Sequence, residues 1–212
     1  MKGFSDEKRD LLREELLDTG RKQFARYGLD KTTIADLTGE IDVAPSTFYQ
    51  FFDSKDECYL AVLERETERF YGRAVTPLEG TDDPERAIRE FLRITFEELE
   101  TNPLVEQLFT GDDYERLTRL YSDEELAEQV DRELGYLRPY IETWQAEGKI
   151  RDGDPEAIAG TIEAAATLAP YREEIGEDRY PAIREMMIET IAAGLTTTTD
   201  RGDDPYDDRA HD

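Results

Sequence analysis

The sequence has 212 residues, of which 38% are hydrophobic, and it contains 11 Tyr, 9 Phe and one Trp. This is enough apolar material for one or two domains with a packed core. No apolar stretch is long enough to cross a bilayer, the N-terminus lacks an apolar signal segment, and the single cysteine, Cys58, cannot form an internal disulfide. These features argue against a membrane or disulfide-rich secreted protein and predict a cytoplasmic one.

The net charge of −26 is unevenly distributed along the chain. Residues 1–55 carry a net charge of −2, and residues 56–212 carry −24. Five of the six lysines lie in residues 1–55. Because nucleic-acid binding depends on neutralising phosphates, the cations are concentrated where a nucleic acid could dock. The overall acidity predicts adaptation to a high-salt cytoplasm, as in a halophile.

The hydrophobic period is helical throughout, which predicts an all-α protein of about nine helices. Gly28 is expected to end the first helix, and Pro45 is expected to begin the third. Helical patterns occupy, in chain order, residues 5–27, 33–38, 45–52, 54–73, 84–101, 104–109, 114–120, 123–147, 154–169 and 180–195. The domains expected from this pattern are a DNA-binding domain at 1–54, a helical effector-binding and dimerisation domain at 55–197, and a disordered acidic tail at 198–212.

The segment from Thr32 to Val62 has the pattern of a helix-turn-helix. Two short helices are joined by a turn of four or five residues, and the second helix carries small polar and aromatic side chains. Such a helix can enter a DNA major groove, which is about 12 Å wide, with its outer face toward the bases. An ordinary helical hairpin within a bundle is the alternative interpretation.

Residues 10–63 resemble the DNA-binding domain of the TetR family of transcriptional regulators. Asp42 replaces the usual turn glycine, Ala44 replaces the usual N-cap serine, and Gln50 stands where His or Tyr is common. Asp tolerates a left-handed backbone better than most residues, so the turn is expected to persist. The matching positions, in the family's spacing, are Thr32-Thr33-Ile34-Ala35, Val43, Thr47-Phe48-Tyr49, Phe52, Ser54-Lys55 and Leu60.

The resemblance implies DNA contacts at the start of the first of these two helices, along the second, and at Lys55. Thr32 and Thr33 would meet a phosphate at a helix N-terminus, and Tyr49 and Lys55 would hold the DNA backbone. A half-buried core role for Tyr49 and a solvated role for Lys55 are the alternatives. The complete set of implied DNA-binding residues is Thr32, Thr33, Ala44, Pro45, Ser46, Thr47, Tyr49, Gln50 and Lys55, of which Pro45, Ser46, Thr47 and Gln50 would face the bases.

The resemblance also implies a small-molecule pocket in the C-terminal helices. The alternatives are that the aromatic candidates are plain core and that the threonines bond to their own backbone. The candidate effector-binding residues are Phe91, Thr95, Phe109, Tyr140, Trp144, Thr161 and Ala165. The last two predicted helices are rich in small residues and apolar on more than one face, which favours a homodimer interface there.

The leading hypothesis is a homodimeric repressor that binds a double-stranded DNA operator and is released by a small-molecule effector. No cofactor, metal or catalytic residue is expected. An enzyme is disfavoured because the only histidine is His211, near the end of the chain, and no glycine-rich phosphate loop occurs. A protein-interaction module that has lost DNA binding is the remaining alternative, and the net acidity is its best support.

Overall fold

The structure is a computed structural model that describes residues 6–110 and 113–197. The expected tail and His211 lie outside the described residues. Within them, the one β-type pairing is an isolated bridge between Ile150 and Thr196, so the chain is all-α. The helices are α1 (Asp6–Lys31), α2 (Ile34–Gly39), α3 (Pro45–Phe48), α4 (Lys55–Ala74), α5 (Pro84–Thr101), α6 (Pro103–Thr110), α7 (Asp113–Thr118), α8 (Asp123–Ala146), α9 (Pro155–Ala166), α10 (Arg172–Ile175) and α11 (Tyr180–Leu195), with 3-10 turns at Thr76–Leu78 and Ala169–Tyr171.

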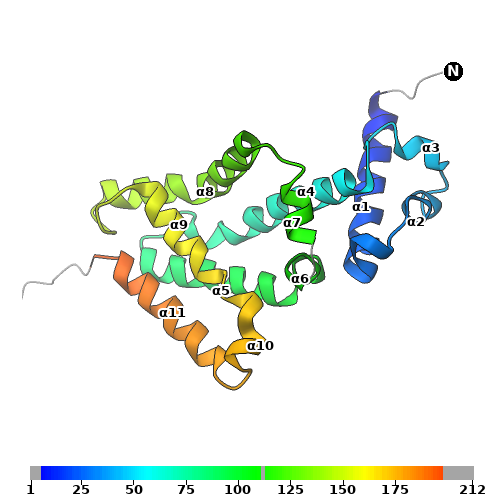
Figure 1. The fold of residues 1–212 in the computed structure, drawn as a ribbon. Coiled ribbons are helices and arrows are strands. Elements are labelled where there is room, and N and C mark those ends of the chain that lie inside the picture. The colour runs from blue at the N-terminus through cyan, green and yellow to red at the C-terminus, as the bar shows by residue number, and fades with distance from the viewer. Residues whose placement is uncertain (1–5, 111–112, 198–212) are drawn as a thin grey trace, which may run out of the picture.

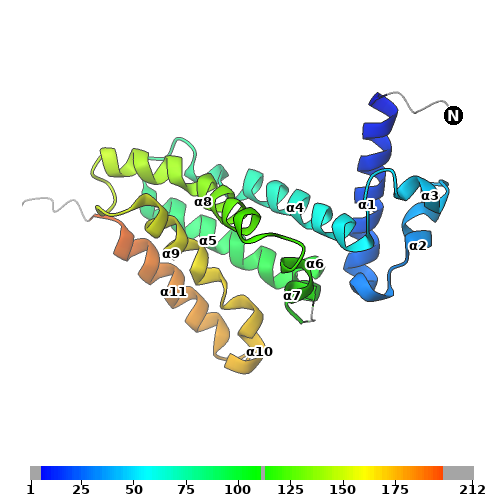
Figure 2. The same ribbon diagram turned by 45° about the horizontal axis from the view of Figure 1, so that its top comes forward.

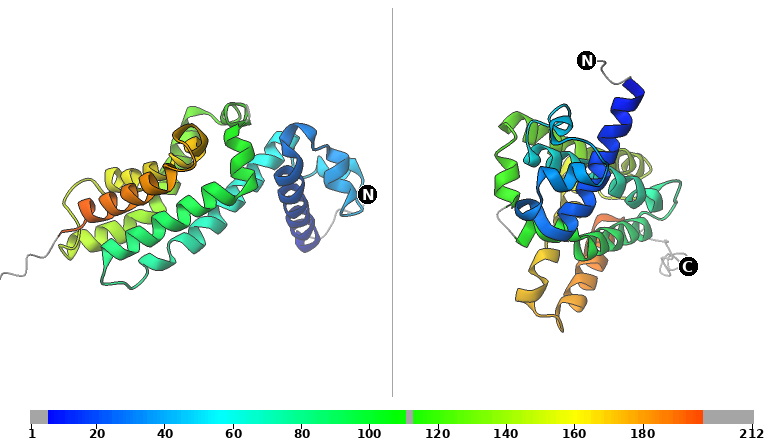
Figure 3. Two further views of the ribbon diagram at one scale, coloured as in Figure 1. Left: turned by 90° about the horizontal axis from the view of Figure 1, so that it is seen from below. Right: turned by 90° about the vertical axis from the view of Figure 1, so that its right-hand side faces the viewer.

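The molecule is elongated, with a small head of α1, α2 and α3 at one end and a helical bundle at the other (Figure 1). Helix α4 runs from the head into the bundle, where it packs on α5, and α11 lies on the other side of α5 (Figure 2). Seen from below, the head stands apart from the bundle except along α4 and the α6–α7 region (Figure 3). Helix α4 contributes Tyr59 and Val62 to the buried cluster of the head, and Tyr71 and Ala74 to that of the bundle.

Local backbone chemistry shapes the head as the sequence predicts. Gly28, with φ of 75°, breaks the helical geometry near the end of α1, which suits a residue without a side chain. Asp42 adopts the left-handed conformation, with φ of 53°, in the turn between α2 and α3. Thr33 caps α2 through a reciprocal pair of bonds with Asp36.

Helix α3 is shorter than the expected helix at 45–52. It begins at Pro45 but ends at Phe48. The next amides bond three residues back: the N–H of Gln50 donates to the carbonyl of Thr47, and that of Phe51 to the carbonyl of Phe48. After this tighter turn, the aromatic side chain of Phe52 points inward. Its ring packs on that of Phe48, with ring centroids 5.5 Å apart.

Candidate functional site

The α2–turn–α3 unit stands on an apolar base. Leu37 and Phe48 are fully buried against α1 and α4, and Phe48 also contacts the ring of Tyr49 edge-on at 5.5 Å. Burial of these side chains fixes α3 in one orientation, because rotating the helix would expose large apolar side chains to water. The opposite face of α3 is therefore held outward in a defined position.

The outward face carries most of the residues that the sequence singles out. Tyr49 is 56% exposed, so its ring is available to a partner while one edge rests on Phe48. Thr47 is half-buried. The exposed members of the set are Thr33, Ala44, Pro45, Ser46, Tyr49 and Gln50. Hydroxyl, amide and methyl groups in this arrangement are those that read base edges and thymine methyls.

Two expected phosphate contacts are turned inward instead. Thr32 is 1% exposed, and its hydroxyl donates to the carbonyl of Gly28 at 2.8 Å. The ammonium of Lys55 donates to the backbone carbonyls of Thr32, at 2.7 Å, and of Leu29. These bonds tie the start of α4 and the entry to α2 to the end of α1, where helix carbonyls lack partners, and a phosphate contact for either side chain stays a prediction.

The N-terminus of α2 carries its own anion. The Asp36 carboxylate accepts from the Thr33 backbone N–H at 2.8 Å and from the Thr33 hydroxyl at 2.6 Å. Hydrogen bonding to that hydroxyl, and to the backbone, lowers the pKa of Asp36, so the group is ionised at neutral pH. Thr33 is exposed, but its hydroxyl is engaged with Asp36.

Arginines of α1 add a cation that sequence reasoning did not select. The guanidinium of Arg9 lies 5.8 Å from the ring centre of Phe51 and 3.4 Å from the carbonyl oxygen of Gln50. Arg13, one turn further along α1, lies over Phe52 at 5.6 Å. Arg9 therefore stands beside the exposed α3 surface, where it can meet a phosphate. Its spacing of four from Arg13 on one helix face is the only sequence signal for it.

The bundle contains a cavity of about 640 Å³ between α4, α5, α8 and α9, and residues of α6 and α7 line it on the side of the head. Apolar and aromatic side chains form most of its wall. Of the candidate effector residues, Phe91 and Thr95 line it. The Thr95 hydroxyl donates to the carbonyl of Phe91 at 2.8 Å and so bonds to its own helix.

Four other candidate effector residues, Tyr140, Trp144, Thr161 and Ala165, do not line this cavity. Trp144 and Ala165 are buried in the packed core of the bundle, and Tyr140 packs beside Trp144 with ring centroids 6.3 Å apart. Thr161 is exposed and donates its hydroxyl to the carbonyl of Ala157 at 2.7 Å. The side chain of Phe109 lies outside the described residues.

Sequence reasoning missed the carboxylates that line the cavity. The Tyr71 hydroxyl donates to the carboxylate of Glu163 at 3.1 Å, and the Tyr121 hydroxyl donates to Glu64 at 3.0 Å. Burial raises the pKa of Glu163 to about 7, the negative charge of Glu133 adds to this, and the bond from Tyr71 opposes it. Burial also raises the pKa of Glu133. These carboxylates are therefore poorly hydrated.

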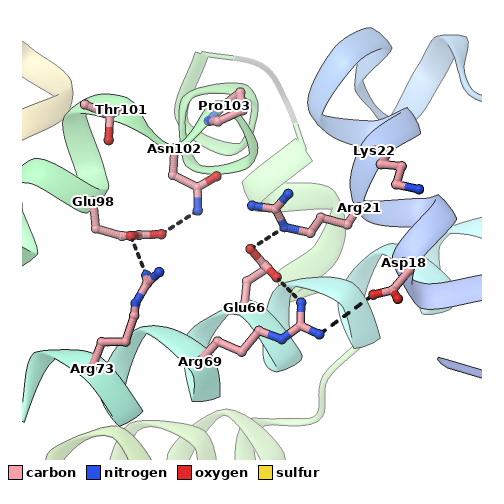
Figure 4. A pocket seen from close by; sticks show the side chains of 10 residues that line it. All are labelled: Asp18, Arg21, Lys22, Glu66, Arg69, Arg73, Glu98, Thr101, Asn102 and Pro103. Atoms are coloured by element: carbon pink, nitrogen blue, oxygen red, sulfur yellow. Dashed lines mark hydrogen bonds and ion pairs between the residues drawn. The ribbon is translucent and has the colours of Figure 1, made fainter. Parts of the chain in front are cut away.

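A second, polar cavity of about 520 Å³ lies where α1, α4 and the α5–α6 junction meet. Figure 4 shows its ion pairs: Arg21 of α1 binds Glu66 of α4 at 2.7 Å, and Arg73 of α4 binds Glu98 of α5 at 2.9 Å. Asn102 donates to Glu98 at 2.6 Å. Glu66, Glu98 and Asn102 line both cavities, so they form a shared wall between the bundle cavity and the base of the head.

No helix in the described ranges is long and apolar enough to cross a membrane.

Comparisons with known proteins identify the head. The family model for bacterial regulatory proteins of the tetR family matches residues 16–62. The transcriptional repressor NicS of Pseudomonas putida is 23% identical over 150 residues, which cover 71% of each chain. A transcriptional repressor of Mycobacterium tuberculosis, Rv1474c, is 35% identical over 68 residues, or 32% of this chain and 35% of that one.

Solved structures extend the likeness to the whole fold. A TetR-family transcriptional regulator from Pectobacterium atrosepticum superposes with a TM-score of 0.73 at 21% identity, covering 92% of this chain and 99% of that one. A transcriptional regulator from Saccharomonospora viridis, solved in complex with choline, has a TM-score of 0.60 at 18% identity, with coverage of 89% and 100%. The chain therefore carries the DNA-binding domain of the tetR family of bacterial regulatory proteins, at residues 16–62, and has the overall fold of TetR-family transcriptional regulators.

Proposed function

We propose that the protein is a homodimeric repressor whose α3 surfaces bind an operator and whose bundle cavity binds the effector that releases it. The observation that carries the proposal is the exposed row from Pro45 to Gln50, held outward by the buried ring of Phe48. A surface held this rigidly can present hydrogen-bonding groups to base edges without losing much conformational freedom on binding. The domain boundaries proposed are 1–54 for the head and 55–197 for the bundle.

Within the head, we divide the contacts by what each group can reach. Pro45, Ser46, Thr47 and Gln50 face the bases, because they start α3 and follow it outward. The Tyr49 hydroxyl and other exposed donors contact the phosphate backbone, which sets position but carries no sequence information. Thr32 and Lys55 support this surface from within through their bonds to the end of α1, and Arg9 joins the backbone contacts.

The dimer is proposed to form through α9 and α11. Met186 of α11 is 71% exposed and Ile183, one turn earlier, is 39% exposed. Ala193 and Gly194 continue the exposed face toward the end of α11 and are small enough for close helix contact. A two-fold dimer places its reading helices about 34–36 Å apart, which matches half-sites one helical turn apart on DNA.

The shared wall supplies a route from effector to operator. A ligand that reaches Glu66 or Glu98 from the bundle cavity competes with Arg21 and Arg73 for the same carboxylates. Weakening the α1–α4 pair would free the head to change its orientation. A ligand shifts this equilibrium only by its difference in affinity for the two orientations. Two regulators of similar fold were solved in complex with a small molecule, one with choline and one, RolR, with resorcinol, which supports small-molecule binding by this fold.

The decisive experiment is a DNA-binding assay at molar KCl with the promoter next to the protein's own gene. Thr47→Ala and Tyr49→Ala are compared with Tyr171→Ala, a bundle tyrosine of similar exposure, at 59%. Sequence-specific binding that both head variants lose and the bundle variant keeps supports the repressor. A folded dimer that binds no DNA at any salt concentration would instead favour a protein-interaction module.

A further inference from the structure

The wall of the bundle cavity carries charge of one sign. Five glutamates line it, at positions 64, 66, 98, 133 and 163, and its described lining residues include no Lys, Arg or His. Most of the remaining wall is apolar, so these carboxylates face a surface with few groups that can hydrate or neutralise them. The cavity therefore has an unbalanced negative potential in a poorly hydrated space.

Among the described residues, three of the five carboxylates have no ion pair: Glu64, which accepts from the Tyr121 hydroxyl, and the more buried Glu133 and Glu163. Glu66 and Glu98 bind arginines on the outer side of the shared wall. Glu133 receives only a neutral amide bond, from Gln129 at 3.3 Å, and Glu163 only the hydroxyl bond from Tyr71. Across the ranges that the structure describes, no Lys or Arg nitrogen lies within the 4.0 Å of an ion pair with either group, although the more distant charge of Arg132 favours ionisation of Glu133.

Aromatic rings stand next to this pair of carboxylates. Tyr71, which holds Glu163, stacks on Tyr136 with ring centroids 4.2 Å apart and planes 8° apart. Phe70 and Phe91 line the same cavity. The face of an aromatic ring attracts a cation, and the attraction is stronger where water is excluded. Carboxylates and aromatic faces around an apolar space form a binding site for an organic cation.

We propose that the effector is an amphipathic organic cation, an amine or a quaternary ammonium group on an apolar body. Its charged group lies between Glu133 and Glu163 beside Tyr71, and its apolar body extends along Phe91 and Leu134. This inference rests on the proposed role of the cavity as the effector site. It adds the charge and the shape of the ligand.

The alternatives in charge are disfavoured by the same wall. An anion would bring a like charge against two carboxylates in a space of low polarity, which costs several kcal/mol at contact distance. A neutral ligand would displace the remaining water from Glu133 and Glu163 and would provide no counter-charge. A cation removes that cost, because it replaces the lost hydration by direct attraction.

The test uses three probes that share one body and differ in charge. These are 4-phenylbutyltrimethylammonium, 4-phenylbutanol and 4-phenylbutyrate, each titrated calorimetrically into the full-length protein at pH 8. We expect the cation to bind about tenfold or more tightly than the neutral alcohol, by an ion pair and ring contacts that the alcohol lacks. The anion should show no binding in the same range.

Variants locate the site and control for folding. Glu163→Gln keeps an acceptor for the Tyr71 hydroxyl and should reduce the preference for the cation to near unity, and Glu133→Gln should weaken it by several-fold. Glu128→Gln makes the same charge change at an exposed position of α8 that does not line the cavity, and should leave the preference unchanged. Thermal unfolding verifies that all three variants are folded.

The outcomes separate this inference from the proposed function. Equal or tighter binding of the alcohol or the anion, no binding of the cation, or an unchanged preference in Glu163→Gln overturns the cationic effector. Operator release is measured separately, with the cation added to the protein–DNA complex. If the cation binds in the cavity but leaves the operator bound, the cationic site stands and the release mechanism fails.

Discussion

Arg21 of α1 and Glu66 of α4 form an ion pair, Nε to Oε2 at 2.7 Å, that joins the reading head to the wall of the bundle cavity. Arg69 reinforces it by binding Glu66 at 3.1 Å from the same helix. Only 13% of the Glu66 side chain is exposed, so the pair is less screened by solvent than most surface ion pairs. A change at Glu66 therefore reaches α1 directly.

Replacing Glu66 by Gln is expected to weaken communication between the cavity and the head. The variant should bind the operator more weakly without ligand, because it loses the same α1–α4 pair, and the further effect of a bound ligand on that affinity should fall by about 0.5–2 kcal/mol. Operator affinity is measured with and without ligand. Glu90→Gln removes an exposed pair with Arg93 within α5 and serves as the control. An unchanged ligand effect in Glu66→Gln would show that the signal takes another route.

Replacing Lys55 by Met is expected to destabilise the head. The ammonium holds the backbone carbonyls of Leu29 and Thr32, and leaving them without a donor costs about 1–3 kcal/mol. Chemical unfolding compares the variant with Lys31→Met, an exposed lysine at the end of α1. If Lys55 instead contacts a DNA phosphate, Lys55→Met should have normal stability. The slope of log operator affinity against log salt concentration should then be smaller by about one.

Glu163 is expected to lower the stability of the folded chain at alkaline pH. Its pKa is raised to about 7, mainly by burial, so the folded state binds a proton that the unfolded state has released between pH 4.5 and 7. Stability from this group is therefore full below pH 4.5 and lost as the pH rises to 7. Glu133, whose pKa is also raised, acts in the same direction, and Tyr71 and Arg132 oppose it.

The corresponding variant, Glu163→Gln, should be more stable than the parent at pH 8 and indistinguishable from it near pH 4. Since the group is half-buried, the gain is about 1 kcal/mol after allowance for solvent screening, or about 2–4 °C in melting temperature. Melting curves at both pH values measure it. Equal melting temperatures at pH 8 would mean that Glu163 is well hydrated.

Replacing Met186 by Glu is expected to convert the dimer to monomer. A charge placed at the centre of an apolar interface has no partner there and costs several kcal/mol per dimer. Light scattering after size exclusion gives the mass. Leu120→Glu, at a leucine that is 47% exposed outside α9 and α11, is the matched control and should stay dimeric. A dimeric Met186→Glu protein would place the interface on another face.

Features of the fold that depend on neighbours in sequence were predictable. The Thr33–Asp36 cap, the start of α3 at Pro45 and the left-handed Asp42 each follow from residues within three or four positions. The cavity was not predictable in this way. Tyr71 and Glu163 meet across 92 residues, and with 52 acidic residues in the chain no pattern marks which carboxylate is buried. The bonds of Lys55 to the carbonyls of Leu29 and Thr32 were not predictable for the same reason, because these partners lie more than 20 positions earlier in the chain.

The hydrophobic cluster of the head is completed by Leu104 of α6 and Leu117 of α7, which lie far beyond residue 54 in the chain. Both side chains are nearly fully buried against the head. A chimeric regulator made by exchanging reading heads at residue 54 would therefore join two mismatched apolar surfaces. Grafting this head onto another bundle should require transplanting the contacting positions of α6 and α7 as well.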